Sequence, residues 1–165
     1  MTDTERRTAA AKFAASWKDR GDEKQETQRF WLSLLQNVYG VEQPTEIVEF
    51  EKRVEVVNND GTTTTKYIDG YLPATRTLIE QKGMKIDLKK GERQSDGAML
   101  TPFQQGRRYG GFLPNPEQPR WTVVCNFQTF EIHDMNRPND EPEIIRLADL
   151  EKEYSRLDFL VDTGK

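Results

Sequence analysis

A turn motif between two strand-like segments constrains the fold of this chain most strongly. The motif occupies residues 58–61 and reads Asn-Asn-Asp-Gly, a run that favours the tight turn of a β-hairpin. Apolar and charged residues alternate over 47–57 before the turn, and β-branched and aromatic residues dominate 62–71 after it. The sequence therefore predicts an antiparallel hairpin near the middle of the chain.

The remaining hydrophobic patterns predict helices before this hairpin, and strands and helices after it. Helical spacing over 4–17 and 23–39 indicates two helices, and residues 75–82 indicate a third strand. Further along we expect an exposed polar loop over 83–97, a helix over 98–109, strands over 121–127 and 130–134, and a last helix over 147–160. This order predicts a single α/β domain over residues 1–165, with a central mixed β-sheet flanked by helices.

Size and composition indicate a soluble, intracellular protein. The 165 residues suffice for one domain with a hydrophobic core, and 32% of them are charged. No apolar stretch approaches the roughly 20 residues of a membrane-spanning helix, and the polar N-terminus lacks the apolar segment of a signal peptide. The one cysteine, Cys125, excludes an internal disulfide and a cysteine-based zinc cluster. We therefore expect a cytoplasmic location and no membrane partner.

The charge distribution leaves room for a nucleic-acid partner. The net charge of the chain is −4, which by itself argues against nucleic acid. Residues 80–108, however, carry seven basic and four acidic residues, a local charge of +3. Candidate contacts to a phosphate backbone are Lys66, Lys85, Arg107 and Arg108. The alternative for these residues is a solvated surface of mixed charge.

Charged residues end two neighbouring strand-like segments, and this pattern is the strongest indication of chemistry in the chain. Asp69 ends the second strand, and Glu80 and Lys82 end the third. Alternate residues of a strand share a face, so Glu80 and Lys82 project together, and Asp69 joins them if the strands pair. Two carboxylates, helped by the backbone carbonyl of Gln81, suit a hard divalent cation, and the lysine can activate a water molecule. The alternative is that these are solvated charges at strand ends.

Two further segments contain candidate site residues. Gln105 and Tyr109 are four residues apart, so they share one side of the expected helix over 98–109. They can lie over the site and hydrogen-bond Lys82, or the tyrosine can pack on the sheet while the glutamine faces solvent. Glu26, in the second expected helix, can be a further ligand of the metal or its water, or a hydrogen-bond partner that holds the basic site residues. Alternatively, it is a first-turn glutamate stabilised by the helix dipole.

Several other residues of chemical interest are expected in structural roles. His133 is the only histidine and has no serine or cysteine partner pattern. Cys125 lies in an apolar strand and is expected in the core. The tryptophans are expected to pack in the core or between helices rather than to stack on bases; they are Trp17, Trp31 and Trp121.

Taken in order along the chain, these motifs resemble the PD-(D/E)xK nuclease superfamily. Asp69 and the run 80–82 match its Asp…Glu-x-Lys motif, with Ile68 in place of the usual proline. Residues 105–109 match a Gln-x-x-x-Tyr pattern on the helix that follows the catalytic lysine, and Glu26 matches an acidic residue of the first core helix. The arrangement over roughly residues 8 to 150 is similar to the N-terminal nuclease region of MmeI-like type IIL restriction–modification enzymes.

The resemblance implies a restriction-endonuclease-like fold and a Mg²⁺-dependent endonuclease acting on double-stranded DNA, with Mn²⁺ as a substitute metal. It implies catalytic roles for a set of residues that comprises Asp69, Glu80, Lys82, Gln105 and Tyr109. Such enzymes are single chains that also contain an adenine methyltransferase and a target-recognition domain. This chain has neither a Gly-rich methyl-donor loop nor an Asn-Pro-Pro-aromatic motif.

We therefore expect only the nuclease portion of such an enzyme, with S-adenosylmethionine bound by domains outside this chain. Covalently linked methyltransferase and target-recognition domains are the implied partners, together with a transient dimer on DNA. Two other hypotheses remain open. The domain can be a non-catalytic nuclease-like module that binds DNA or docks other domains, or it can be a repair or phage-defence nuclease of the same superfamily.

Overall fold

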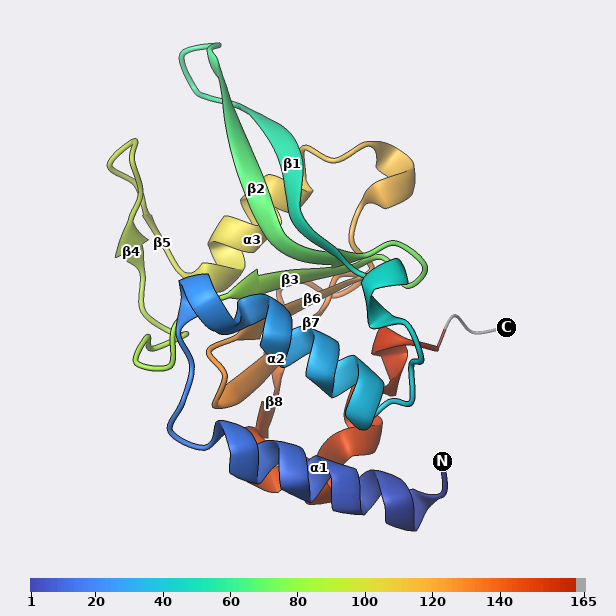
Figure 1. The fold of residues 1–165 in the computed structure, drawn as a ribbon. Helices are drawn as coiled ribbons and strands as arrows, with labels where there is room; N and C mark the ends of the chain where they lie inside the picture. The colour runs from blue at the N-terminus through green and yellow to red at the C-terminus, as the bar shows by residue number, and fades with distance from the viewer. Residues whose placement is uncertain (163–165) are drawn as a thin grey trace.

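A six-stranded mixed sheet forms the centre of the molecule in the computed structural model, which describes residues 1–162 (Figure 1). Its strands, in spatial order, are β1 (Glu49–Val57), β2 (Thr63–Leu72), β3 (Thr77–Gln81), β6 (Trp121–Cys125), β7 (Thr129–Asp134) and β8 (Glu143–Arg146). Strands β3 and β6 are parallel, and every other neighbouring pair is antiparallel. The predicted α/β class with a central mixed sheet is confirmed.

Helices cover both faces of this sheet, as expected for a restriction-endonuclease-like core. The helices are α1 (Asp3–Trp17), α2 (Glu23–Asn37), α3 (Pro102–Gly110) and α4 (Leu150–Glu153). Short 3₁₀ segments are Pro44–Glu46, Asn115–Glu117, Leu147–Asp149 and Tyr154–Leu160. Figure 1 shows α2 and α1 in front of and below the sheet, whereas α3 lies behind it. None of the helices within residues 1–162 combines the length and apolar composition needed to span a membrane.

Side-chain caps fix where the main helices begin. Asp22 precedes α2 and accepts hydrogen bonds from the backbone N–H groups of Lys24 and Gln25. Thr101 and Gln104 form a reciprocal capping box at the start of α3, where Pro102 occupies the first turn. These contacts satisfy backbone donors that have no partner within a helix. They also set the ends of α2 and α3 that lie nearest the charged strand ends.

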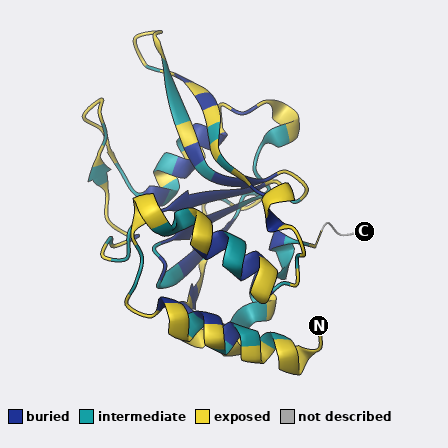
Figure 2. Cartoon of the chain, viewed as in Figure 1, coloured by how far each residue is buried: buried dark blue, intermediate teal, exposed yellow. Residues whose placement is uncertain are grey.

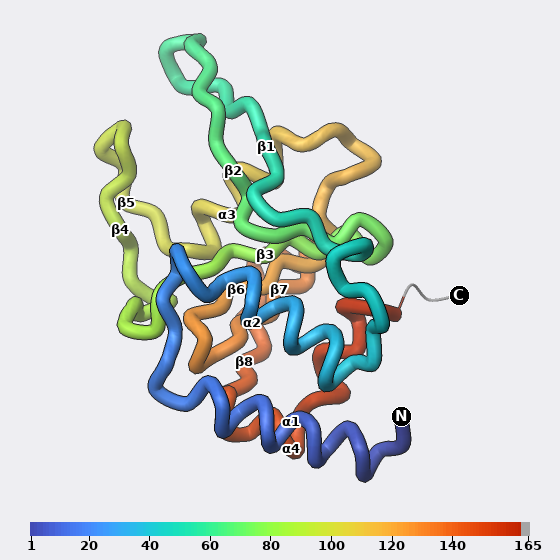
Figure 3. The backbone as a smooth tube through the Cα atoms, in the orientation of Figure 1, coloured from blue at the N-terminus to red at the C-terminus, as the bar shows by residue number. Residues whose placement is uncertain are grey.

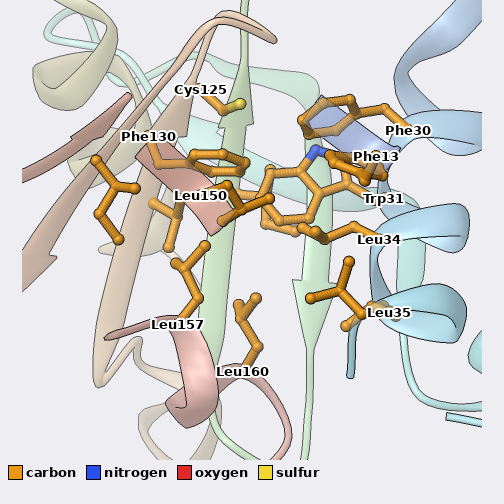
Figure 4. Close-up of a cluster of buried hydrophobic side chains, with 14 of the residues drawn as sticks. Phe13, Phe30, Trp31, Leu34, Leu35, Cys125, Phe130, Leu150, Leu157 and Leu160 are labelled. Atoms are coloured by element: carbon orange, nitrogen blue, oxygen red, sulfur yellow. The ribbon is translucent and has the colours of Figure 1, made fainter. Parts of the chain in front are cut away.

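The larger hydrophobic core lies between the sheet and α1, α2 and the C-terminal segment. Figure 4 shows Phe30, Trp31 and Leu34 of α2 pointing toward Phe130 of β7. The ring centroids of Phe30 and Phe130 are 5.8 Å apart, a distance at which aromatic rings attract one another. The predicted structural role of Cys125 is confirmed, since its side chain is fully buried in this core.

A smaller core lies on the opposite face, beneath α3. It contains Leu78 of β3, Tyr109 of α3, and residues from the hairpin and the loop after α3, namely Val54, Val56, Ile68, Tyr71 and Leu113. Figure 2 shows β3 buried along its length between the two layers. Residues at the end of β3 are therefore held from both sides, which positions the charged groups there.

Two hairpins project from the molecule, as the tube in Figure 3 shows: one is the β1–β2 edge of the six-stranded sheet, and the other is a separate two-stranded sheet. In the longer hairpin, β1 pairs with β2 from Glu49 opposite Tyr71 to Val57 opposite Thr63. The predicted turn is confirmed, because the backbone N–H of Asn58 donates to the carbonyl of Thr62 at 2.7 Å. The shorter hairpin pairs β4 (Glu92–Arg93) with β5 (Met99–Leu100). This pair lies in and beyond the segment expected to be an exposed loop.

The elements that differ from the sequence-based expectation are short or polar. Strand β8 (Glu143–Arg146) was not predicted, because its four residues show too little alternation to be distinguished from a loop. The helix expected over 98–109 begins only at Pro102, after its threonine cap. The single helix expected over 147–160 is instead one α-helical turn between two 3₁₀ segments.

Candidate active site

The pairing of β2 with β3 brings the two predicted carboxylates together. Gly70 lies opposite Ile79, so Asp69 and Glu80 follow at the adjacent positions of the two strands. The carboxylate of Asp69 accepts a 2.7 Å hydrogen bond from the backbone N–H of Gln81, which ties it to the end of β3. Glu80 is 3% exposed. The expected convergence of the two strand ends is thus present in the structure.

Lys82 completes this cluster from the same face of β3. Its Nζ lies 3.4 Å from Oε1 of Glu80 and donates a 3.0 Å hydrogen bond to Oε1 of Gln105. The Gln105 amide in turn donates to the hydroxyl of Tyr109 at 3.3 Å. Helix α3 therefore places Gln105 in direct contact with the lysine, as one of the two sequence-based alternatives has it. Tyr109 hydrogen-bonds Gln105 and also packs in the smaller core, as the other alternative has it.

Gln81 lies between these residues and faces the opposite layer. Its side-chain oxygen accepts a 2.7 Å hydrogen bond from the indole N–H of Trp31 in the larger core. Because alternate residues of a strand face opposite sides, this anchor directs Glu80 and Lys82 toward α3. The backbone N–H of Lys82 donates to the carbonyl of Cys125 at 2.8 Å, so β6 also supports this end of β3.

Helix α3 approaches β3 closely because it has glycine at its contact positions. A Cβ atom at Gly106 would lie 3.3 Å from Cδ2 of Leu78 and 3.5 Å from Cβ of Glu80. A Cβ atom at Gly110 would lie 3.1 Å from Cδ1 of Leu78. Larger residues would hold the helix farther from the sheet. The distance between Gln105 and Lys82 therefore depends on these two glycines.

The electrostatics of the cluster favour an additional positive charge. Burial raises the pKa of Asp69 to about 6, although the N–H of Gln81 opposes this change. Burial, followed by repulsion from Asp69, raises the pKa of Glu80 well above its ordinary value. Burial alone would lower the pKa of Lys82, but Glu80, Glu23 and other nearby carboxylates raise it. Two carboxylates and one ammonium thus share one site, and in the absence of a cation burial and mutual repulsion disfavour the ionised form of both acids.

The donor chemistry of this cluster fits a hard divalent cation. Asp69 and Glu80 supply carboxylate oxygens, and the backbone carbonyl of Gln81 is part of the same strand end. Within residues 1–162, no three side chains of the His, Cys, Asp or Glu type come together as a complete ligand set. The cluster therefore offers two carboxylates, and further ligands would have to be backbone, water or substrate oxygens.

Glu26, a first-turn acid of α2, is engaged by groups other than the two strand-end carboxylates. Its two oxygens are engaged by the guanidinium of Arg20 at 2.7 Å and by the backbone N–H of Asp22 at 3.2 Å. The acid of α2 that faces the cluster is Glu23, which lines one surface pocket together with Asp69. Helical periodicity places Glu23 and Glu26 near one another, so only the observed entry angle of α2 distinguishes them.

The four basic residues expected to contact DNA have different environments. Arg107 and Lys85 are exposed, whereas Lys66 is partly buried in β2. Arg108 is already engaged, since its guanidinium pairs with Asp96 at 3.2 Å. It also lies 3.5 Å from the side-chain oxygen of Asn58. Arg108 thus contacts the turns of both hairpins, a role that its sequence position did not indicate.

One family model matches most of the chain. Its description is "MmeI, N-terminal domain", and it matches residues 8–165. No curated protein and no solved structure matches the chain.

Proposed function

The chain belongs to the MmeI N-terminal domain family, the nuclease domain of MmeI-like type IIL enzymes, and we propose that it hydrolyses phosphodiester bonds of double-stranded DNA with Mg²⁺. The observation that carries this proposal is the cluster of partly buried Asp69 with buried Glu80 and Lys82, in which Gln105 contacts the lysine. Residues 1–165 would form one nuclease domain within a restriction–modification enzyme. That enzyme would act in the cytoplasm, and its methyltransferase and target-recognition domains would bind S-adenosylmethionine and the target sequence.

In the proposed mechanism, Asp69 and Glu80 hold the divalent ion through their carboxylate oxygens, with the carbonyl of Gln81 as a third ligand. A Mg²⁺ or Mn²⁺ ion bound there would supply Lewis acidity and lower the pKa of a bound water. The raised pKa of Glu80, caused by burial and then by repulsion from Asp69, supports this assignment, because a cation would favour the ionised form of both acids. Glu23, which lines the same pocket as Asp69, would hydrogen-bond water at the edge of the site.

Lys82 would orient the attacking water and stabilise the charge that develops on the phosphate oxygens. Gln105 would keep the ammonium group in place through the 3.0 Å hydrogen bond, and Tyr109 would orient the Gln105 amide. Of the basic residues, Arg107 and Lys85 are exposed and would contact the DNA backbone. Lys66 would contribute from the side of the hairpin.

Cleavage of both strands would require two active sites, so we propose a transient dimer on DNA. Sedimentation of the chain with a cleavable duplex would show a species with two protein molecules for each duplex. A single bound protein throughout the cleavage reaction would contradict the dimer without affecting the assignment of the catalytic residues.

The first experiment is titration calorimetry with Mn²⁺ on the wild type and on Asp69→Ala and Glu80→Ala. We expect binding by the wild type and its loss in both variants, since each removes a proposed ligand. Glu55→Ala is a matched control, because Glu55 is an exposed carboxylate on the outer part of β1. That variant should bind the metal as the wild type does.

The same titration in the presence of a short duplex covers the case in which DNA phosphate completes the ligand set. Wild-type binding with DNA, lost in Asp69→Ala, would support the nuclease and show a shared metal site. No binding under either condition would overturn the metal-dependent mechanism. It would favour a nuclease-like module that binds DNA or docks other domains without catalysis.

A further inference from the structure

Strand β7 contains a buried acid–base pair that the proposed mechanism does not use. Nε2 of His133 lies 2.6 Å from Oε1 of Glu131, and the two residues are 6% and 5% exposed. Because a carboxylate can only accept, the histidine ring donates this hydrogen bond. Glu131 lies opposite Val124, which in turn lies beside Glu80, so the pair shares the sheet face of the proposed active site.

Helix α3 contacts this second pair as well as the proposed catalytic lysine. The ring of Phe103 stacks on the ring of His133, with 3.6 Å between their centroids and 6° between their planes. Two residues later, Gln105 accepts the hydrogen bond from Lys82. The helix thus bridges an acid–base pair on β7 and an acid–base pair on β3, and each pair consists of residues two positions apart on its strand.

The geometry of an α-helix couples these two contacts. Successive residues are about 100° apart around the axis, so Phe103 and Gln105 project about 200° apart, from opposite flanks of α3. Gly106 lies against Leu78 and Glu80, so it marks the side of α3 that contacts the sheet. A rotation of α3 that lifts Phe103 off His133 would therefore also displace Gln105 from Lys82.

Stability alone gives little reason for a buried histidine–glutamate pair at this position. Removing such a pair from water is costly, and apolar residues of similar volume often stabilise a core equally well. Thr122 lies opposite His133, and its buried hydroxyl has no hydrogen-bond partner within residues 1–162. The layer beneath the start of α3 is thus more polar than packing requires.

We propose that the His133–Glu131 pair is a positioning device, which fixes the rotation of α3 through Phe103 and thereby holds Gln105 against Lys82. Glu131 orients the ring of His133, and this ring fixes the position of the side of α3 that carries Phe103. The helix in turn positions the Gln105 amide that contacts Lys82. The functional consequence rests on the proposed nuclease activity, whereas the mechanical coupling between His133 and Gln105 does not.

The coupling can be measured without DNA or metal by NMR of the 165-residue chain. The reporter is the side-chain amide signal of Gln105, assigned by its loss in Gln105→Glu. Phe103→Leu keeps an apolar group but removes the stacked ring, so we expect it to shift this signal. Phe103→Tyr retains the stacking face, so we expect the wild-type signal.

Phe159→Leu is the matched control for general destabilisation. Phe159 is also a partly buried aromatic residue stacked on another ring, that of Trp121, with 4.6 Å between centroids. It should lower the melting temperature by an amount similar to Phe103→Leu and leave the Gln105 signal in place. A Gln105 signal unchanged in Phe103→Leu, or moved equally by Phe159→Leu, would overturn the proposed coupling.

Single-turnover cleavage then tests the functional consequence. We expect Phe103→Leu to reduce the rate about 10- to 100-fold at saturating DNA, with unchanged DNA affinity, because a displaced catalytic group slows chemistry rather than binding. Phe103→Tyr should restore the rate, and Phe159→Leu should not change it. If the wild type itself does not cleave DNA, the proposed function fails, and the NMR result alone decides the coupling.

Discussion

Asp69 shows how a single residue at the proposed cation site can oppose the stability of the fold. Its pKa is raised to about 6 in the folded protein, mainly by burial, whereas an aspartate in an unfolded chain has a pKa near 3.9. Between these two values the folded state binds more protons than the unfolded state. Folding stability from this group is therefore fully present below about pH 4 and falls as the pH rises through about 6.

The first prediction is that Asp69→Asn stabilises the chain at pH 7.5 in EDTA, by an amount on the order of 2–3 kcal/mol. Asparagine can still accept the hydrogen bond from Gln81 but carries no charge to bury. Thermal unfolding at pH 4 and pH 7.5 measures the stability of the variant and the wild type. The difference in their free energies of unfolding should be smaller at pH 4. Mg²⁺ should stabilise the wild type and not the variant.

Asp60→Asn is the control variant, because folding lowers the pKa of Asp60 and raises that of Asp69. Hydrogen bonds from the side chain and backbone of Thr62 lower the pKa of Asp60, which is exposed in the hairpin turn. Its charged form is therefore favoured by folding, and this variant should not gain stability at pH 7.5. An Asp69→Asn protein no more stable than the wild type at pH 7.5 would show that the carboxylate is not under electrostatic strain.

Gly106 illustrates a residue whose small size matters to the site. Alanine is a better helix former than glycine by about 1 kcal/mol, but its Cβ would lie 3.3 Å from Leu78 in this position. We expect Gly106→Ala to leave the melting temperature nearly unchanged, because these effects oppose one another. It should reduce cleavage, since a lifted α3 lengthens the contact between Gln105 and Lys82.

Gly111→Ala is the control variant for the second prediction, the one on Gly106→Ala. A Cβ atom there would meet the backbone carbonyl of Arg107 at 3.4 Å, an ordinary contact distance, and Gly111 has a negative φ of −65°. Rates measured side by side should fall only for Gly106→Ala. Equal rates in the two variants would mean that the depth of α3 on the sheet does not control the site.

At the scale of elements, the two hairpins are connected through α3. Arg108 pairs with Asp96 in the turn of the shorter hairpin and approaches Asn58 in the turn of the longer one. Such partly exposed contacts contribute at most about 1 kcal/mol to global stability. These contacts should instead act locally, by keeping the tips of the two hairpins ordered.

The third prediction is that Arg108→Ala increases amide hydrogen exchange in both tips, over residues 58–62 and 94–98, without a clear change in melting temperature. Asp96→Ala should affect only the shorter hairpin. The charge exchange Arg108→Asp with Asp96→Arg should restore protection there. If Arg108→Ala increased amide hydrogen exchange in only one hairpin tip, Arg108 would not connect the two hairpins.

Arg107→Ala separates this structural role from DNA contact. Arg107 is exposed on the same helix. Its removal should leave hydrogen exchange unchanged, weaken DNA binding and reduce the salt dependence of that binding by about one phosphate contact. A loss of hairpin protection in this variant would show that the two arginines cannot be assigned separate roles.

The sequence predicted the elements that have strong local signals and missed those that depend on neighbours. The turn at 58–61 and the alternating strands around it have a fixed period, and therefore the hairpin and the meeting of Asp69 with Glu80 could be predicted. Strand β8 (Glu143–Arg146) forms only because β7 offers an edge to pair with. Periodicity likewise could not decide between Glu23 and Glu26, because the entry angle of α2 is a tertiary property.

The spacing of His133 and Glu131 in the sequence is a local signal for this pair. Its spacing of two residues on a strand is the same spacing that drew attention to Glu80 and Lys82. What the sequence could not supply is the ring of Phe103 above the histidine, which comes from a different element. Contacts between elements that are distant in the chain are thus the part of the site that required a structure.

At the scale of the whole molecule, one arginine joins the N-terminal helix to the C-terminal segment. The guanidinium of Arg6 lies 5.3 Å from the ring centre of Tyr39 and 4.7 Å from that of Tyr154, and it forms an ion pair with Asp158. It also donates to the carbonyl of Val38. Arg6 therefore connects α1, the end of α2 and the final 3₁₀ segment on the sheet face opposite α3.

The fourth prediction is that Arg6→Ala lowers the free energy of unfolding by about 2–3 kcal/mol, because it removes a partly buried ion pair and two cation–π contacts. For a chain of this length, that loss corresponds to a fall in melting temperature of about 4–10 °C. Arg6→Lys should recover only part of it, since an ammonium lacks the planar face that lies between the two rings.

Arg7→Ala provides the neighbouring control. Arg7 is exposed, and its closest acidic partner, Glu151, is 3.7 Å away, so the change should cost no more than about 0.5 kcal/mol. Both variants should cleave DNA at the wild-type rate per folded molecule, because neither contacts the layer that contains Glu80 and α3. A slower rate in Arg6→Ala at a temperature where it is fully folded would show that the two faces of the sheet are coupled.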